Sequence, residues 1–308
     1  MITFIISILA LILGYFTYGL FIERIFGADS TKQTPAYSMQ DGIDYIPMPW
    51  WKAFLIQFLN IAGLGPIVGA VLGAAYGPIA FLWIVVGNIL AGAVHDYFSG
   101  MISIRMGGIS IPEIIGKYLG LNVKQFMRGF TLLLMILVGA AFISGPAALL
   151  AALTPEALTK NFWVWIILIY YVLATLLPID KIIGRIYPVF GLALLIMAVG
   201  IGGAIFWGGY AFDIPELTLG NFENMKSNAD AYPLFPMLFV TISCGAISGF
   251  HATQSPMMAR CLKNEKLGRR VFYGAMVTEG VIALIWAAIG MSFYGGVHGL
   301  NDAIAGYK

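Results

Sequence analysis

Charged side chains are scarce in this sequence. Only 10% of its 308 residues are Asp, Glu, Lys or Arg, whereas 60% are hydrophobic and the mean hydropathy is +0.87. An ordinary soluble domain carries about 25% charged residues. The composition therefore excludes a soluble globular protein and indicates an all-α, polytopic membrane protein, in which each apolar stretch satisfies its backbone groups as a helix.

The residues that build metal and cofactor sites are also few. Two cysteines, Cys244 and Cys261, suggest neither a disulfide framework nor a metal site. There is no dinucleotide fingerprint, phosphate-binding loop or basic–aromatic face for nucleic acid. His95 and Asp96 form the only adjacent pair suited to metal binding or catalysis, and no third ligand accompanies them. We therefore expect no cofactor, no metal, no nucleic-acid partner and no enzymatic activity.

Apolar stretches long enough to cross a bilayer are what the chain has in abundance. Residues 2–22 lack a basic leader and a cleavage site, which favours a retained helix over a signal peptide. Residues 110–120 suggest a short amphipathic surface helix, and 296–308 look like a loop. The eight expected spans are 2–22, 53–76, 78–104, 129–153, 161–178, 187–209, 233–261 and 271–295.

The basic residues are distributed unevenly between the loops. With these spans, 14 of the 17 Lys and Arg residues fall on one side, and the other side has only Lys160, Lys226 and Lys308. Loops rich in Lys and Arg stay in the cytoplasm. The sequence therefore predicts a multi-pass membrane protein with cytoplasmic basic loops and both ends of this chain outside.

Two of the expected spans, 53–76 and 233–261, contain residues that weaken or break helices. A backbone interrupted at membrane depth is tolerated only where protein or water surrounds it. The alternatives are a kinked packing helix for the first span and a helix end reaching water for the second. The interrupting residues are Gly63, Gly65 and Pro66 in the first span, and Gly245, Ser248 and Gly249 in the second.

The two interrupted spans are five apart and enter the membrane from opposite sides. Such a pair indicates an inverted-repeat transporter. Residues 2–22 are then an extra leading helix, 53–209 a first five-helix repeat and 233–295 the start of a second. We expect one transmembrane domain, 1–308, in which the last three helices of the second repeat are missing, and no transport by these residues alone.

Several motifs resemble one family closely. SGFHATQSPMMARCLKNE (248–265) and GRRVFYGAMVTEGVIALIWA (268–287) are similar to the carbon starvation protein A family, as are DGIDYIP (41–47), IAGLGPIVG (61–69) and AGAVHD (91–96). The resemblance covers nearly the whole chain. The sequence departs from the family pattern at Ala70, where a second proline is usual.

The resemblance implies a fold and an activity. Members are inner-membrane uptake systems for peptides and, in some cases, for pyruvate with protons. They are grouped with the amino acid–polyamine–organocation superfamily, whose LeuT-like fold is a five-plus-five inverted repeat. Members are also longer, so the resemblance implies missing C-terminal helices as a partner of this chain. The implied function is import of peptides or small carboxylates in response to carbon starvation.

The residues of the two breaks are the candidate substrate site. Freed N–H groups and the positive end of a half-helix suit a carboxylate. The candidates for proton coupling are Glu279, deep in an apolar span, with Asp96 and His95. The candidate substrate-binding residues are Gly63, Gly65, Pro66, Gly245, Ser248, Gly249, His251, Thr253 and Gln254.

Each ionisable candidate has a plainer interpretation. His251 would then be an interfacial histidine, Glu279 a neutral acid that packs helices together, and Asp96 a partner of Arg105. For the protein as a whole, the alternative is a membrane sensor that binds a ligand without moving it. A sensor usually carries a soluble signalling domain, and the sequence has none. We therefore expect a proton-coupled secondary transporter with the lipid bilayer, protons and a small molecule as its partners.

Overall fold

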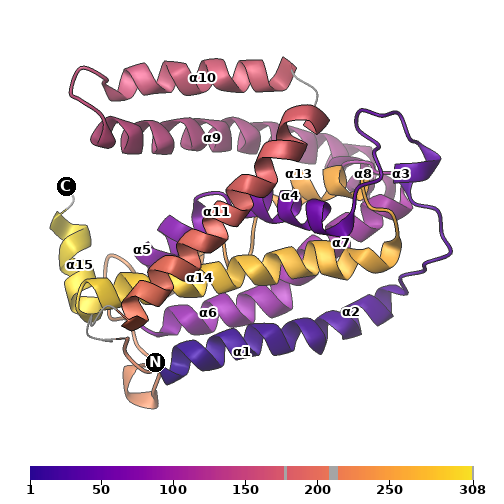
Figure 1. The fold of residues 1–308 in the computed structure, drawn as a ribbon. Helices are drawn as coiled ribbons and strands as arrows, with labels where there is room; N and C mark the ends of the chain where they lie inside the picture. Colours follow the sequence, from indigo (N-terminus) through magenta and orange to yellow (C-terminus); the bar gives the residue numbers. More distant parts are fainter. Residues whose placement is uncertain (177–178, 208–213, 307–308) are drawn as a thin grey trace. The chain divides into compact units, whose positions relative to one another are not determined.

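The computed structural model describes residues 1–176, 179–207 and 214–306, and most of these residues are helical (Figure 1). The β-structure of the described residues is one isolated bridge between Met48 and Leu262. The chain divides into two compact units, Met1–Ile109 with Ile186–Lys308, and Ser110–Arg185. The all-α prediction is confirmed, while a single transmembrane domain stays a prediction.

The first half of the larger unit follows the expected spans. Helices α1 (Ile2–Phe16) and α2 (Tyr18–Phe26) together make one apolar stretch of 25 residues. The short helix α3 (Pro35–Ser38) precedes the first of the two spans that were expected to be interrupted, residues 53–76. This span is broken, as predicted. It consists of α4 (Trp50–Ala62), a π-helical turn (Gly65–Gly69) and α5 (Ala70–Ala74), bent by 56°. Helices α6 (Ile79–Gly87) and α7 (Ala93–Arg105) flank a second π-helical turn, Asn88–Gly92.

The second half of this unit differs more from expectation. The expected span 233–261 is helical only in pieces: a π-helical turn (Leu234–Leu238), α12 (Phe239–Thr241) and α13 (His251–Ala259). A 3₁₀ turn (Glu265–Leu267) and a π-helical turn (Arg269–Tyr273) lead into α14 (Gly274–Phe293).

The expectation of a loop after residue 295 was wrong. The chain forms helix α15 (Gly296–Gly306), although this stretch contains three glycines. Val297, Leu300 and Asn301 lie on one face of the helix and are buried. Burial of that face outweighs the low helix propensity of glycine, which is only about 1 kcal/mol per residue.

The smaller unit is a helical hairpin with a short helix before it. Helix α8 (Ile111–Leu119) confirms the short helix expected at 110–120. Helices α9 (Leu121–Leu153) and α10 (Lys160–Leu176) lie side by side (Figure 1). Helix α11 (Ile179–Trp207) follows and continues into the larger unit.

Four stretches are long and apolar enough to cross a membrane, and the bent α4–α5 pair makes a fifth. They confirm a membrane protein; the count of eight spans and the inverted repeat stay predictions. The ends expected at residues 178 and 209, and the side chains of Lys181, Arg185 and Lys308, lie outside the described residues. The four stretches are Ile2–Phe26, Ile79–Arg105, Leu121–Leu153 and Glu265–Phe293.

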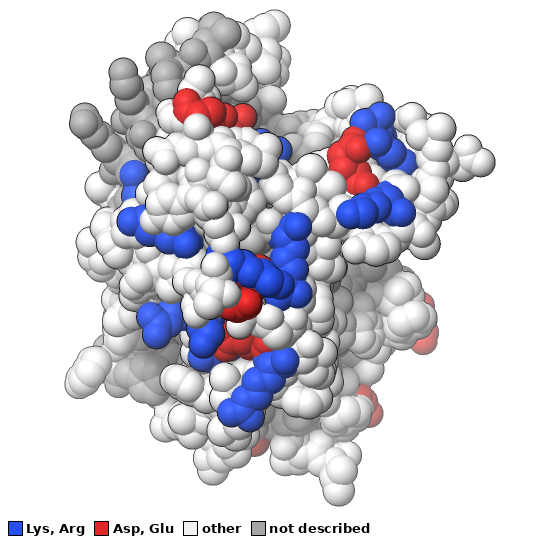
Figure 2. Space-filling view, turned by 90° about the vertical axis from the view of Figure 1, so that its right-hand side faces the viewer, with Lys and Arg blue, Asp and Glu red and all other residues white. Residues whose placement is uncertain are grey.

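Helix α14 is central to the larger unit and packs against α1, α4, α5 and α6 (Figure 1). Lys and Arg side chains gather with a few acidic ones on one face of the molecule (Figure 2). Three of the ion pairs in the larger unit are Arg105–Glu265, Arg269–Glu23 and Arg260–Asp44.

Candidate functional site

The two breaks in the membrane-spanning backbone touch each other. Gly63 ends α4 with φ 52°, and Gly245 lies in the non-helical stretch between α12 and α13 with φ 96°, so both use backbone that glycine adopts without strain. A Cβ on Gly65 would lie 2.2 Å from Cβ of Cys244, and the Ser248 hydroxyl donates to the Ile61 carbonyl at 3.2 Å. The two breaks are therefore in direct contact.

Side chains from α6, the neighbouring π-helical turn and α14 satisfy the freed backbone of the second break. The Gly245 N–H donates to Oε1 of Glu279 at 2.9 Å, and the Gly245 carbonyl accepts from Nδ2 of Asn88 at 2.8 Å. The indole of Trp83 donates to the Ile242 carbonyl at 3.0 Å. A buried backbone group without a partner costs about as much free energy as a lost hydrogen bond. By pairing with these groups, the three side chains allow the backbone to remain non-helical at the second break.

The π-helical turn Asn88–Gly92 brings α6 and α7 against the same break. A Cβ on Gly92 would lie 2.3 Å from the carbonyl oxygen of Ala246, so only glycine permits this approach. The turn also leaves the Ile89 carbonyl free to accept from the Tyr273 hydroxyl at 3.0 Å. Single π-helical turns of this kind occur often at functional sites.

A cluster of polar side chains, fully buried, lies where α4, α7 and α13 meet. Oδ1 of Asp96 accepts hydrogen bonds from the Ser255 hydroxyl at 2.5 Å and from Nε2 of Gln57 at 2.8 Å. Nε2 of Gln57 also lies 3.1 Å from the Ser255 hydroxyl. All three residues and His251 are buried. Three helices thus hold one carboxylate in a fixed position, which we call the Asp96 cluster.

Two histidines extend the Asp96 cluster to the surface. Nδ1 of His95 and Nδ1 of His251 are 3.0 Å apart, so one nitrogen donates and the other accepts. His95 is exposed, whereas His251 is buried. Nε2 of His251 faces Oδ2 of Asp96 at 3.9 Å, and neither atom has a hydrogen-bond partner. The arrangement connects an exposed imidazole to a buried carboxylate through one buried imidazole.

The predicted site residues lie in the Asp96 cluster, at the two breaks, and farther along α13. Asp96, His95 and His251 belong to the Asp96 cluster, while Glu279 binds the second break through Gly245. Arg105 does not pair with Asp96, because its guanidinium is taken by Glu265 and the Gly27 carbonyl. The predicted substrate residues in or beside the breaks are Gly63, Gly65, Pro66, Gly245, Ser248 and Gly249; Thr253 and Gln254 follow, half-buried, on α13.

Sequence reasoning missed three residues that the structure brings to these sites: Gln57, Asn88 and Ser255. Each is a fully buried polar side chain within a largely apolar helix or helical turn. Gln57 and Asn88 carried a usable signal, since a lone amide inside an apolar span needs a partner to offset its desolvation. Gln57, Asn88 and Ser255 make five side-chain hydrogen bonds here, and in four of these the partner is more than 150 residues away in the sequence.

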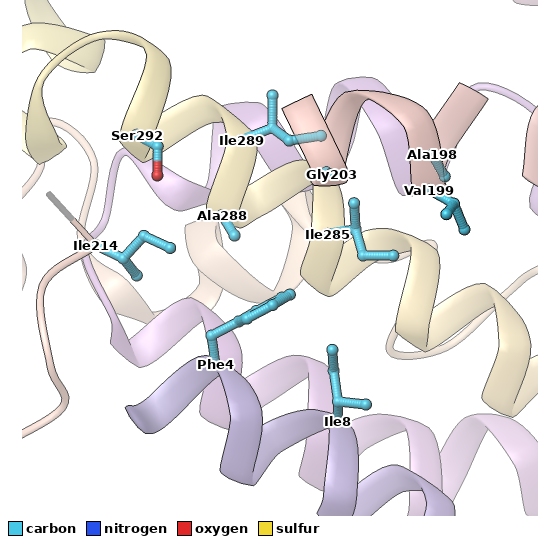
Figure 3. Close-up of a pocket in the computed structure, with 11 residues that line it drawn as sticks. Phe4, Ile8, Ala198, Val199, Gly203, Ile214, Ile285, Ala288, Ile289 and Ser292 are labelled. Carbon is cyan, nitrogen blue, oxygen red and sulfur yellow. The ribbon is translucent and has the colours of Figure 1, made fainter. Parts of the chain in front are cut away.

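An apolar cavity of about 270 Å³ lies apart from these polar residues, between α1, α11 and α14 (Figure 3). Phe4 and Ile8 face it from α1, and Ile285 from α14; Ser292 supplies its one polar side chain. Such a lining suits hydrocarbon and offers nothing to an ionic substrate. The polar site of the larger unit is therefore the Asp96 cluster with the breaks beside it.

Comparisons with known proteins identify the family of this chain. The sequence model of the family "Carbon starvation protein CstA" matches residues 1–159 and 147–303. An uncharacterized membrane protein of Haemophilus influenzae is 46% identical, over 99% of this chain and 94% of that protein. No solved structure matches.

Named relatives are longer. The pyruvate/proton symporter BtsT of Escherichia coli is 30% identical over 91% of this chain and 47% of its own length. The peptide transporter CstA of Helicobacter pylori is 29% identical over 89% of this chain and 48% of its own length. The chain thus spans about half the length of these two relatives and nearly all of the Haemophilus protein. The chain belongs to the carbon starvation protein CstA family.

Proposed function

We propose that this chain forms the substrate-binding and proton-binding part of a secondary transporter that imports small carboxylates or peptides with protons under carbon starvation. The observation that carries the proposal is the Asp96 cluster, a buried carboxylate and imidazole beside two breaks in membrane-spanning helices. Ionisable groups inside a membrane protein are costly and mark ion or proton pathways. The names of the relatives, a pyruvate/proton symporter and a peptide transporter, agree with this function.

Asp96 and His251 give a physical reason for coupling. With one proton between them, the pair is neutral overall, either as an ion pair or as neutral acid and base. A second proton leaves a net positive charge in a fully buried place, which is unfavourable unless an anion offsets it. A substrate carboxylate supplies that anion, so proton and substrate bind best together. The expected route for the proton is His95, then His251, then Asp96.

The substrate carboxylate binds at the start of α13 in this proposal. Gly249 is exposed and has open space around it, and the adjacent helix begins at His251 with the positive end of its dipole. Ser248, Thr253 and Gln254 add polar side chains on either side. A carboxylate here would lie close to the imidazoles that receive the proton.

Glu279 has a separate part in the same cycle. Its Oε1 accepts from the Gly245 N–H, and this bond is weaker when Glu279 is protonated than when it is a carboxylate, because a neutral acid is a poorer acceptor. Loss of this bond would loosen the second break. Through Glu279, a proton therefore acts on the backbone at the break, while Asp96 links a proton to the substrate.

The test is uptake of radiolabelled pyruvate, dipeptides and tripeptides by cells that express the whole protein encoded by the gene. Asp96→Asn keeps the size of the side chain and its hydrogen bonds with Gln57 and Ser255 but cannot titrate. We expect it to reduce uptake driven by a pH gradient by about 100-fold and to spare exchange at equal pH. Asp302→Asn, at an exposed position of α15, is the matched control and should transport normally.

Gradient-driven uptake by Asp96→Asn equal to that of the wild type would exclude Asp96 as the coupling group. Saturable binding without movement of any of the three substrates would favour the sensor over the transporter. Pyruvate uptake alone would identify a small carboxylate, and competition by peptides would identify a peptide as the substrate.

The orientation is tested separately by cysteine labelling. Asn264 lies in the loop before α14, which we propose to be cytoplasmic, and Asn224 lies before the second break, on the other side. In a background without Cys244 and Cys261, Asn224→Cys should react with an impermeant maleimide added outside, and Asn264→Cys should react only after permeabilisation. The reverse pattern would invert the orientation.

A further inference from the structure

A second cavity opens near the start of α4 and has a different chemistry from the Asp96 cluster. Its volume is about 500 Å³, and it lies between α1, α4, the turn Arg269–Tyr273 and α14. Most of its lining residues are aliphatic or aromatic, and two arginines of the turn Arg269–Tyr273 belong to the lining as well. It is lined by Ile12, Tyr15, Phe16, Trp50, Phe54, Arg269, Arg270, Gly274, Val277 and Thr278.

The two arginines of this cavity are not equivalent. Nε of Arg269 donates to Oε2 of Glu23 at 2.6 Å, and Nη1 donates to the Tyr15 carbonyl at 3.3 Å, so its charge is neutralised within the protein. Arg270 is exposed and stacks on Trp50, with 5.7 Å from Cζ to the ring. It has no carboxylate partner among the residues that the structure describes. Its charge is therefore available to a ligand.

The position of the cavity restricts what that ligand is. Trp50 is 44% exposed, and tryptophans at the end of a span lie at the level of the lipid headgroups. From there α1 and α14 both run as apolar helices toward the other end. A ligand in this cavity meets a cation and an indole at the interface and hydrocarbon-like side chains below them.

We propose that this cavity binds an anionic phospholipid. Its phosphate pairs with Arg270, whose planar guanidinium matches phosphate oxygens with two parallel hydrogen bonds. An acyl chain lies along Ile12, Phe16, Phe54 and Val277. Basic pockets between membrane helices on the cytoplasmic side are known to take anionic headgroups, and the rest of this pocket fits the chain of the same lipid.

Gly274 keeps the floor of the cavity open. A Cβ at this position would meet Cε2 of Tyr15 at 3.5 Å and Cε2 of Phe54 at 3.9 Å, which is ordinary contact. A larger side chain would extend past these rings into the space assigned to the acyl chain. Gly274→Leu therefore fills the cavity without changing any charge.

The experiment measures lipid binding by the purified protein in a neutral detergent. Dioleoylphosphatidylglycerol is added at increasing concentration, and the melting temperature and the lipids retained in native mass spectrometry are recorded, with dioleoylphosphatidylcholine and inorganic phosphate as comparisons. We expect a rise in melting temperature and a retained lipid with phosphatidylglycerol only. Arg270→Ala should weaken this binding by about tenfold, as loss of a charge-assisted contact does.

Two further variants separate the lipid site from general effects of charge. Arg24→Ala removes an exposed arginine that does not line the cavity and should bind phosphatidylglycerol like the wild type. Gly274→Leu should lose the lipid while keeping Arg270. Equal binding by the wild type, Arg270→Ala and Gly274→Leu would overturn the proposal. A response to inorganic phosphate as large as that to the lipid would overturn it as well, because the acyl chain would then contribute nothing.

Discussion

Helices α9 and α14 are both long apolar helices, yet they are used differently. The most apolar stretch of α9 has a mean hydropathy of 2.3 and is 6% buried within the protein, whereas the corresponding stretch of the α14 span has 1.7 and is 72% buried. The more hydrophobic helix is thus the less buried one. In a membrane, lipid covers apolar side chains as well as protein does, so hydropathy identifies a span but not its neighbours.

What distinguishes the two helices is where their ionisable side chains lie. Glu279 is fully buried in α14, while Lys124 and Arg128 lie near the start of α9 and pair with Glu113 of α8. A buried carboxylate requires partners from other helices, and Glu279 has one in the second break. The packed helices are therefore those with polar groups at depth, and substitutions in them should cost most.

Among the variants that compare the packed helices with α9, Glu279→Gln should have the largest effect. The variant keeps an acceptor for the Gly245 N–H but cannot titrate, so folding is preserved. We expect uptake driven by a pH gradient to fall by at least about tenfold and exchange at equal pH to continue. Uptake and melting temperature are measured on the same preparation. Unchanged accumulation of substrate would mean that Glu279 is only a packing residue. Asp96 alone would then couple protons to transport.

Next in size is Gly92→Ala, compared with Gly139→Ala. At Gly92 a Cβ would lie 2.3 Å from a backbone carbonyl oxygen, which cannot move without shifting the second break. We expect the free energy of unfolding to fall by about 3 kcal/mol. Around Gly139 in α9 the space that a Cβ would occupy is open. Alanine at this position should therefore raise the free energy of unfolding by about 0.5–1 kcal/mol through its higher helix propensity. Denaturation in detergent micelles measures both, and equal effects would contradict the difference between the two helices.

A smaller effect is expected from Gln57→Ala, with Gln125→Ala as its match. Gln57 is fully buried and donates to Asp96, whereas Gln125 is exposed on α9. Loss of a hydrogen bond to a buried carboxylate should lower the free energy of unfolding by about 2 kcal/mol, and the change at Gln125 should stay within about 0.5 kcal/mol. A Gln57 variant as stable as the Gln125 variant would mean that Asp96 does not depend on this amide.

The spans and the breaks could be predicted from the sequence, whereas the polar contacts between helices depended on segments that are distant in the sequence. Apolar stretches predicted the spans at residues 2–22 and 78–104, and Gly63 and Gly245 predicted the breaks, because both signals are local. The Asp96 cluster was only half predicted. His95 and Asp96 are neighbours in sequence, but Ser255 joins them from 159 residues away. Neither hydropathy nor helix propensity contains that pairing.

The smallest effect is expected in the hairpin unit, from Glu113→Gln. Hydrogen bonds from Lys124 and then Arg128 hold the pKa of Glu113 below its usual value, and its side chain is 33% exposed to solvent. A lowered pKa stabilises the folded state above the unfolded value of 4.5 and loses that contribution as the pH falls through the folded value. At pH 7 the variant should melt less than about 2 °C below the wild type, since exposed ion pairs contribute little. The gap should close in acid, where both side chains are neutral, and in 1 M salt, which screens exposed charges. A difference in melting temperature that persists in acid would show that Glu113 acts through packing rather than charge. A difference much larger than about 2 °C at pH 7 would mean that the hairpin depends on polar contacts as α14 does.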